Sequence, residues 1–168
     1  DLLNDSFSSS TLSKTIEEKY GVGHQIALEQ FSASERQQIC GLQAQKVISY
    51  YGYKFQINHG TPWDQNAYLY PDTDEDIFEK ANQPEFDFVL VGHSHYPFIK
   101  RLSHSTIINP GSVGQNRKEG GVANWAFMDL ETNSLEIMNT YYSVIKLAQK
   151  VKKHDPNVAY NHSILFRK

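Results

Sequence analysis

Hydrophobic residues along the chain gather in short runs, and several of these runs predict β-strands. Residues 47–57 carry β-branched and aromatic residues on both sides of Gly52, which predicts a hairpin that turns at that glycine. Residues 86–91 and 106–108 are short, mostly apolar runs, typical of strands that are buried on both faces of a sheet. A second hairpin is predicted over residues 125–141.

Other hydrophobic residues recur three and four positions apart, a spacing that predicts helices. The predicted helices are one through Leu12, Ile16 and Tyr20 that ends at Gly21, one from Ser32 to about Leu42, one of about two turns from Asp74 with Thr73 as its cap, and one through Ile145, Ala148 and Val151 that ends before Pro156. The second helix has Glu35 three residues after Ser32, the spacing of a capping box. Because helices and strands alternate, with hairpins among them, we expect an α+β fold with mixed sheets covered by helices.

Composition restricts the class of protein. A chain of 168 residues is long enough to bury a core, and its single cysteine rules out a disulfide framework or a cysteine-rich zinc module. The net charge of −3 argues against a generally basic surface for nucleic acid. No apolar run approaches the roughly 20 residues that cross a bilayer, and the first residues lack the features of a signal peptide. We therefore expect one soluble, cytoplasmic domain with no membrane partner.

Three predicted strands end in polar clusters flanked by glycine. These clusters are Asn58-His59-Gly60, Gly92-His93-Ser94-His95 and Asn109-Pro110-Gly111-Ser112. In layered α/β proteins, ligands bind beyond the strand ends, so we expect the clusters to form one site. On an extended segment, His93 and His95 point to the same side of the strand. Gly60 and Gly92 allow the backbone to come close to such a site.

The three histidines at these strand ends predict a metal site. Neutral imidazole binds first-row transition ions such as Mn, Fe, Ni, Zn and Co. In hydrolytic two-metal sites the ions are roughly 3.5–4 Å apart, activate water and clamp phosphoryl oxygens. His59, His93 and His95 can serve one ion or two adjacent ions. A histidine that only makes hydrogen bonds at a strand end is the alternative interpretation for each.

Taken in order, these motifs resemble the calcineurin-like metallophosphoesterase superfamily. His59-Gly60 and Gly92-His93-Ser94-His95 resemble its last two metal motifs, and residues 109–117 resemble the next segment of the small bacterial and archaeal phosphodiesterase branch. The resemblance spans roughly residues 32–142. It implies a four-layer αββα sandwich with two mixed sheets and a dinuclear centre at the sheet edge. There, a metal-bound hydroxide is expected to attack a phosphomonoester or a phosphodiester.

The resemblance also implies roles for single residues. His59 and His93 match the two histidines that bind one metal in the family, and His95 matches the histidine that binds the other. We therefore expect the complete protein to hold two divalent ions of Mn, Fe, Ni, Zn or Co. The expected partner is a phosphate-ester substrate, and nucleic acid is expected only as a substrate.

The family's site requires three further motifs, and this sequence has none of them. Asp-x-His, Gly-Asp-x-x-Gly and Gly-Asn-His or Gly-Asn-Cys do not occur, so the bridging carboxylate and the asparagine ligand are missing. Asp1-Leu2 resembles the residues that come after Gly-Asn-x in the third motif. We therefore expect residues 1–168 to be the C-terminal portion of a single metallophosphoesterase domain, with the N-terminal part absent and no activity alone. Sheet edges left unpaired would favour oligomers.

Outside the histidines, Arg117 is the main candidate for binding substrate. It comes after the glycine-rich turn and is expected to bind a substrate phosphate, with a surface arginine beside Lys118 and Glu119 as the alternative. The aromatic residues Trp63, Tyr68 and Tyr70 are expected to pack in their loop near His59, with a wall of the substrate site as the alternative. For the whole protein, the alternative to catalysis is a scaffold of the same fold that binds protein partners, as the retromer sorting subunit does. The three histidines favour catalysis.

Overall fold

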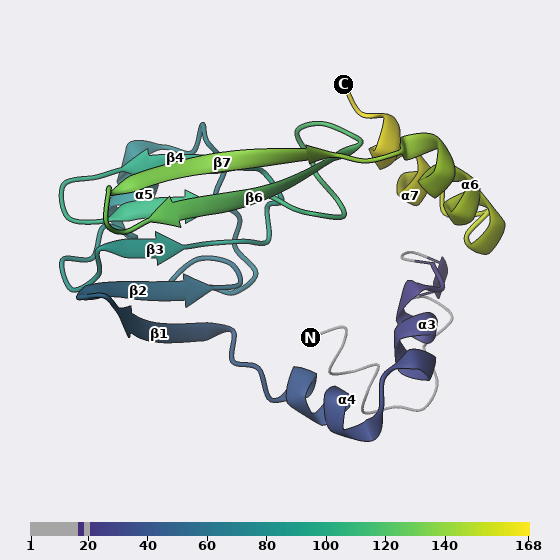
Figure 1. Cartoon of the computed structure of the whole chain (residues 1–168), viewed down its shortest axis with the longest axis horizontal. Coiled ribbons are helices and arrows are strands. Elements are labelled where there is room, and N and C mark those ends of the chain that lie inside the picture. Colours follow the sequence, from purple (N-terminus) through teal and green to yellow (C-terminus); the bar gives the residue numbers. More distant parts are fainter. Residues whose placement is uncertain (1–16, 19–20) are drawn as a thin grey trace. The chain divides into compact units, whose positions relative to one another are not determined.

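The computed structural model describes residues 17–18 and 21–168 (Figure 1). These residues form two compact units. The helical unit comprises the described residues up to Gln43 together with Ser143–Phe166, and the sheet unit comprises Ala44–Tyr142 with Arg167–Lys168. The helix predicted through Leu12, Ile16 and Tyr20 lies outside the described residues.

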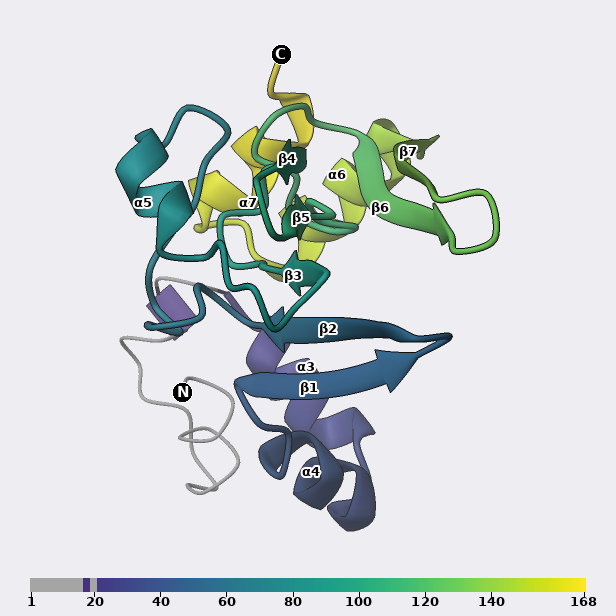
Figure 2. The same ribbon diagram turned by 90° about the vertical axis from the view of Figure 1, so that its left-hand side faces the viewer.

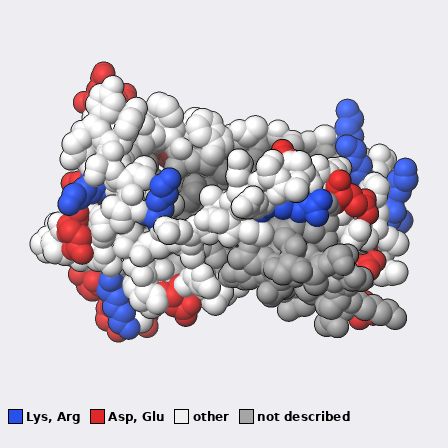
Figure 3. Space-filling model, turned by 90° about the horizontal axis from the view of Figure 1, so that it is seen from below, with Lys and Arg blue, Asp and Glu red and all other residues white. Residues whose placement is uncertain are grey.

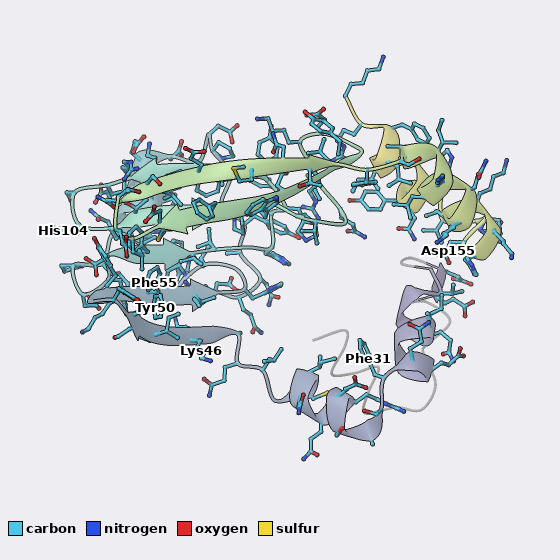
Figure 4. The ribbon with its side chains drawn as sticks, viewed as in Figure 1. Phe31, Lys46, Tyr50, Phe55, His104 and Asp155 are labelled. Atoms are coloured by element: carbon cyan, nitrogen blue, oxygen red, sulfur yellow. The ribbon has the colours of Figure 1, made fainter. Side chains whose placement is uncertain are left out.

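The elements of the helical unit are α3 (Gly23–Gln30), α4 (Ala33–Cys40), α6 (Val144–His154), α7 (Ala159–Ser163) and the 3-10 helix η1 (Ile164–Phe166). Two helices predicted from the sequence, the one from Ser32 and the one through Ile145, are confirmed in the helical unit as α4 and α6. Ser32 caps α4, and its backbone N–H donates to the Glu35 carboxylate at 2.8 Å, which completes the capping box. Val22 N–H donates to Asp155 Oδ1 at 2.6 Å (Asp155 is labelled in Figure 4). In the part of the chain that is described, no helix is long and apolar enough to span a membrane.

The sheet unit is built on a five-stranded sheet with the order β1-β2-β3-β5-β4. Its strands are β1 (Gln45–Tyr50), β2 (Tyr53–Asn58), β3 (Phe88–Leu90), β4 (Phe98–Arg101) and β5 (Thr106–Asn109). β2, β3 and β5 run parallel, while β1 and β4 are antiparallel to their neighbours. The sheet is therefore mixed, as the sequence predicts. The four-residue strand β4 is not predicted by the sequence, because Lys100 and Arg101 make up half of it and it lacks the apolar run that marks β3 and β5.

The first predicted hairpin is confirmed in detail. Tyr51 (φ 50°) and Gly52 (φ 84°) form the two-residue connection between β1 and β2. Two successive positive φ values are the mark of the type I′ turn, whose twist suits adjacent antiparallel strands.

Apolar residues cover both faces of the five-stranded sheet. On one face Phe55, Phe88 and Ile108 pack against β6 (Val122–Asp129) and β7 (Ser134–Tyr141), which form a separate antiparallel pair. On the other face Val89 and Ile107 share a core with Phe78 of α5 (Glu75–Glu79). Figure 2 shows α5 and the β6–β7 pair on opposite sides of the sheet. The sheet unit thus has a helix, a mixed sheet and a second sheet in successive layers, and the second sheet is antiparallel within the described residues.

The helix α5 begins one residue later than predicted and is shorter. Asp74, not Thr73, is its N-cap, and the helix ends after five residues. Thr73 is engaged elsewhere, because its Oγ1 accepts a hydrogen bond from the Tyr70 N–H at 2.9 Å. The hydroxyl therefore closes the preceding turn instead of capping the helix.

Candidate metal and phosphate site

The polar clusters of the sequence meet at one edge of the five-stranded sheet. β2, β3 and β5 are parallel, so their carboxyl ends lie on the same side of the sheet. The arrowheads of β2 and β3 point to this side in Figure 1. His59 follows β2 directly, the Gly92–His95 segment follows β3, and Asn109 ends β5. The Gly92 N–H donates to the His59 carbonyl at 3.0 Å, so the first two clusters are joined through their backbones.

Glycine is required at two of these positions because other backbone groups come so close. A Cβ on Gly92 would lie 2.8 Å from the His59 carbonyl oxygen. A Cβ on Gly60 would lie 2.5 Å from the Gln65 carbonyl oxygen. At both positions the glycine permits a close contact between two backbone segments beside the histidines.

The segment that carries His93 and His95 is not extended, so the expectation of an extended segment with both side chains on one side by strand alternation is wrong. His93 has φ 61° and His95 has φ 55°, both in the left-handed region. This region costs a residue with a side chain about 1–2 kcal/mol. Ser94 is fully buried, while both histidines are half-buried. The chain therefore turns sharply at each histidine, so their directions follow from this turn and not from strand alternation.

Asn109 holds this turn in place from inside the protein. Its side chain is fully buried and donates to the Gly92 carbonyl at 3.2 Å and to Ser94 Oγ at 2.8 Å. Its Oδ1 accepts from the Gly111 N–H at 2.9 Å. One amide thus joins the end of β5 to the Gly92 carbonyl and to the Ser94 hydroxyl, which lie on either side of His93. The strain at the two histidines is balanced by these buried hydrogen bonds.

His59 and His93 form a close imidazole pair. His59 Nε2 and His93 Nδ1 are 3.1 Å apart, and the ring centroids are 4.8 Å apart. Two nitrogens that bind one ion at about 2.1 Å lie about 3.0–3.4 Å apart for angles between a right angle and a tetrahedral one. The observed separation falls within that range. The pair therefore fits two ligands of a single divalent ion in both chemistry and distance.

His95 is oriented by a backbone carbonyl. Its Nδ1 lies 3.1 Å from the Gln115 carbonyl oxygen, which can only accept a hydrogen bond. Nδ1 therefore carries the proton and Nε2 carries the lone pair that a metal needs. Such a carbonyl partner on the far nitrogen is usual for metal-binding histidines.

Two histidines of the site favour the uncharged form. Burial lowers the pKa of His93, and electrostatic interaction with the neighbouring His59 ring and with Arg117 lowers it further. Burial, followed by the charge of Arg117, also lowers the pKa of His95. Both rings are consequently neutral at pH 7, the form that binds metals.

Arg117 lies beside these histidines. Its Cζ is 5.5 Å from the centre of the Tyr68 ring, over the ring, and its charge acts on both His93 and His95. The Tyr68 ring in turn lies 4.2 Å from the His93 ring. The structure thus brings Arg117 together with the three histidines, and it adds Tyr68 to the group.

The described residues do not provide the full ligand set of a two-metal centre. Within residues 17–18 and 21–168, no group of three or more His, Cys, Asp and Glu side chains is arranged to hold an ion. The His59–His93 pair fits one ion in part, and a dinuclear centre needs more ligands than these. No carboxylate bridges the histidines within this part of the chain.

Comparison with known proteins adds the family to this geometry. The family model described as the calcineurin-like phosphoesterase superfamily domain matches residues 16–133, which include His59, His93, His95 and Arg117. The chain belongs to this superfamily. A curated protein from Methanocaldococcus jannaschii, the uncharacterized protein MJ0912, is 31% identical in an alignment of 123 residues that covers 61% of this chain and 47% of the relative. The chain therefore spans about half the length of this curated relative.

Two solved structures share the phosphoesterase fold with the chain. The hypothetical protein PH1004 from Pyrococcus horikoshii superposes with a TM-score of 0.73 at 18% identity, over 98% of this chain and 64% of its own. A metallophosphoesterase from Sphaerobacter thermophilus superposes with a TM-score of 0.70 at 17% identity, over 96% of this chain and 74% of its own. At such low identity these likenesses establish the α+β metallophosphoesterase fold.

The sequence does not single out three contributors to the candidate site. Ser94 is a small polar residue between two histidines, and only the structure identifies it as a buried partner of Asn109. Gln115 acts through its backbone carbonyl, which leaves no trace in the sequence. Tyr68 is expected from the sequence to pack in its loop, and it contacts His93 and Arg117 from that loop.

Charge is distributed without a strong bias on the face drawn in Figure 3. Basic and acidic side chains lie interspersed there. This agrees with the small net charge of −3. In the described site, the positive charge comes from Arg117 next to the histidines.

Proposed function

We propose that His59, His93 and His95 are imidazole ligands of a divalent-metal centre that hydrolyses phosphate esters, and that Arg117 binds the substrate phosphate. The observation that carries the proposal is the 3.1 Å separation of His59 Nε2 and His93 Nδ1, in a chain of the calcineurin-like phosphoesterase superfamily. The ion would be Mn, Fe, Ni, Zn or Co, all of which accept imidazole nitrogen. When bound, such an ion activates water and neutralises charge on phosphoryl oxygens.

The protein's own residues have separate tasks in this proposal. His59 and His93 present two nitrogens to one ion, and His95 presents Nε2 because Gln115 occupies its Nδ1. The Arg117 guanidinium provides planar N–H donors for two phosphate oxygens. Phosphate bound there would lie beside the metal ligands, as required of a substrate that is attacked at phosphorus.

We further propose that this chain alone binds an ion and phosphate without turnover. A hydrolytic pair of ions needs bridging carboxylates, and the family's Asp-x-His and Gly-Asp-x-x-Gly motifs do not occur in the sequence. The described residues likewise contain no group of three or more ligating side chains that could hold an ion. We therefore expect the chain to bind a metal ion but not to hydrolyse phosphate esters.

The test measures phosphate binding and hydrolysis together. Inorganic phosphate is titrated into the metal-free chain, into the Zn²⁺-loaded chain and into His93→Ala with Zn²⁺, by calorimetry. Hydrolysis of bis(p-nitrophenyl) phosphate is followed with Zn²⁺ and with Mn²⁺. We expect phosphate to bind only to the loaded wild-type chain, without hydrolysis above the rate of the metal in buffer.

Two results would contradict this proposal in different ways. Phosphate affinity that is independent of Zn²⁺ and of His93 would refute the phosphoesterase site and leave a non-catalytic scaffold as the better account. Hydrolysis that is lost in His93→Ala would refute the proposal that the chain alone lacks activity.

A further inference from the structure

The contacts of Tyr68 join the two predicted functions of the site. Its ring lies 4.2 Å from the ring of His93, a predicted metal ligand. The same ring lies under the guanidinium of Arg117, the predicted phosphate ligand, with Cζ at 5.5 Å from the ring centre. The tyrosine is 43% exposed, so core packing does not account for its position.

The backbone of Arg117 is fixed independently of Tyr68. Its N–H donates to the His95 carbonyl at 3.1 Å, and its carbonyl accepts from Arg167 Nη1 at 2.9 Å. The preceding residue, Asn116, is buried and donates to the Val122 carbonyl at 3.1 Å. These contacts place the start of the side chain, but an arginine side chain has several further rotatable bonds.

The Tyr68 ring restricts the other end of that side chain. A guanidinium over an aromatic face is held by cation–π attraction, and its N–H groups then point outward in the plane of the group. That plane is the one in which a carboxylate or phosphate is bound through two oxygens. The arrangement keeps the guanidinium near His93 and His95, where its charge is already felt.

We propose that Tyr68 is a positioning residue that holds the Arg117 guanidinium beside the histidines, so that phosphate is bound by a preorganised cation. This inference rests on the proposed function for its consequence, phosphate affinity, but not for its structural claim. The ring, and not the hydroxyl, performs this task. Tyr68→Phe should therefore keep the Arg117 guanidinium in place, and Tyr68→Leu should release it.

The structural claim is tested in the metal-free chain by nuclear magnetic resonance. The mobility of the Arg117 side chain is read from ¹⁵N relaxation of its Nε–H group. We expect a restricted side chain in the wild type and in Tyr68→Phe, and a more mobile one in Tyr68→Leu. An Arg117 side chain that is equally restricted in Tyr68→Leu would overturn the inference, whether or not the chain binds metal.

The consequence is tested by titrating inorganic phosphate into the Zn²⁺-loaded variants. Tyr68→Leu should weaken phosphate binding about fivefold, and Tyr68→Phe should stay within about twofold of the wild type. In Arg117→Met, adding Tyr68→Leu should cause little further loss, since the two residues act through one interaction. Zn²⁺ affinity should be the same in Tyr68→Leu as in the wild type. Equal losses from Tyr68→Leu with and without Arg117 would refute the positioning role.

Tyr50→Leu is the matched control. Tyr50 is also an exposed tyrosine, at 59%, and it pairs with Tyr53 at the beginning of β2, whereas His59 follows the end of that strand. Replacement of Tyr50 should leave the Arg117 signals and the phosphate affinity unchanged. If the wild-type chain binds neither Zn²⁺ nor phosphate, the proposed function fails, while the resonance experiment still decides the role of Tyr68.

Discussion

Asn109→Ala is the substitution that should damage the site most without touching a histidine. The side chain makes hydrogen bonds with the Gly92 carbonyl, with Ser94 Oγ and with the Gly111 N–H, and it is fully buried. Each such bond contributes about 1 kcal/mol, and a buried group left without a partner costs about 1–3 kcal/mol. We therefore expect the free energy of unfolding of the sheet unit to fall by about 3 kcal/mol.

The same substitution should weaken metal binding. His93 and His95 both have positive φ values, each of which costs about 1–2 kcal/mol in the folded chain. Without Asn109 the turn can relax to other backbone angles, and a metal must then restore the strained form. Because about 1.4 kcal/mol corresponds to a factor of ten, Zn²⁺ affinity should fall at least about tenfold.

Stability is measured by urea unfolding with tryptophan fluorescence, since Trp63 and Trp125 both belong to the sheet unit. Zn²⁺ affinity is measured by calorimetry. Ser94→Ala removes only one of the three bonds and should cost about 1 kcal/mol. Asn157→Ala, an exposed asparagine of the helical unit, is the control and should change stability by less than about 0.5 kcal/mol. If Asn109→Ala lowers the free energy of unfolding by less than about 1 kcal/mol and leaves the Zn²⁺ affinity unchanged, Asn109 does not hold the turn at His93 and His95 in place.

Two further substitutions test local features of the sheet unit. Gly92→Ala should destabilise the sheet unit by about 2 kcal/mol in urea unfolding, because the added Cβ would lie 2.8 Å from the His59 carbonyl oxygen. Gly114→Ala is the control and should leave stability unchanged, since no atom lies within 4 Å of the added Cβ. Equal stability of the two variants would contradict the close approach at Gly92. Hydrogen bonds from the backbone N–H of Thr132 and other turn donors lower the pKa of Asp129. The ionised carboxylate therefore stabilises the fold above the usual carboxyl pKa of about 4. This stabilisation is lost as the pH falls through the lowered pKa. Urea midpoints between about pH 6 and pH 2.5 should therefore fall less steeply in Asp129→Asn than in the wild type, and a decline as steep as that of Asp72→Asn would show that the turn bonds have no such effect.

Much of the fold can be predicted from the sequence, because the main elements carry strong local signals. The Gly52 turn, the capping box at Ser32 and the apolar run over 86–91 each specify an element by short-range rules, and each element is present. β4 is not predicted because two of its four residues, Lys100 and Arg101, are charged, so it shows no apolar run. The helix predicted from Asp74 is too long at its start because Thr73 makes a hydrogen bond outside it.

The site is predictable in its residues but not in its geometry. Motif order and strand-end placement are visible in the sequence, and the histidines and Arg117 do come together. The extended arrangement expected for His93 and His95 is wrong, because buried side chains far along the chain, above all Asn109, impose a turn. Such long-range hydrogen bonds, and the contacts of Tyr68, depend on tertiary packing that no local pattern encodes.

The central claim is that His59 and His93 bind one divalent ion, and a Zn²⁺ titration of the metal-free chain by calorimetry tests it most directly. We expect His59→Ala and His93→Ala each to weaken Zn²⁺ binding at least about tenfold, because each removes one of two ligands to the same ion. His104→Ala is the control, since His104 is exposed and lies in the connection between β4 and β5, and its label in Figure 4 is at the far end of the sheet. It should bind Zn²⁺ like the wild type. Equal Zn²⁺ affinities in all four proteins would contradict the account.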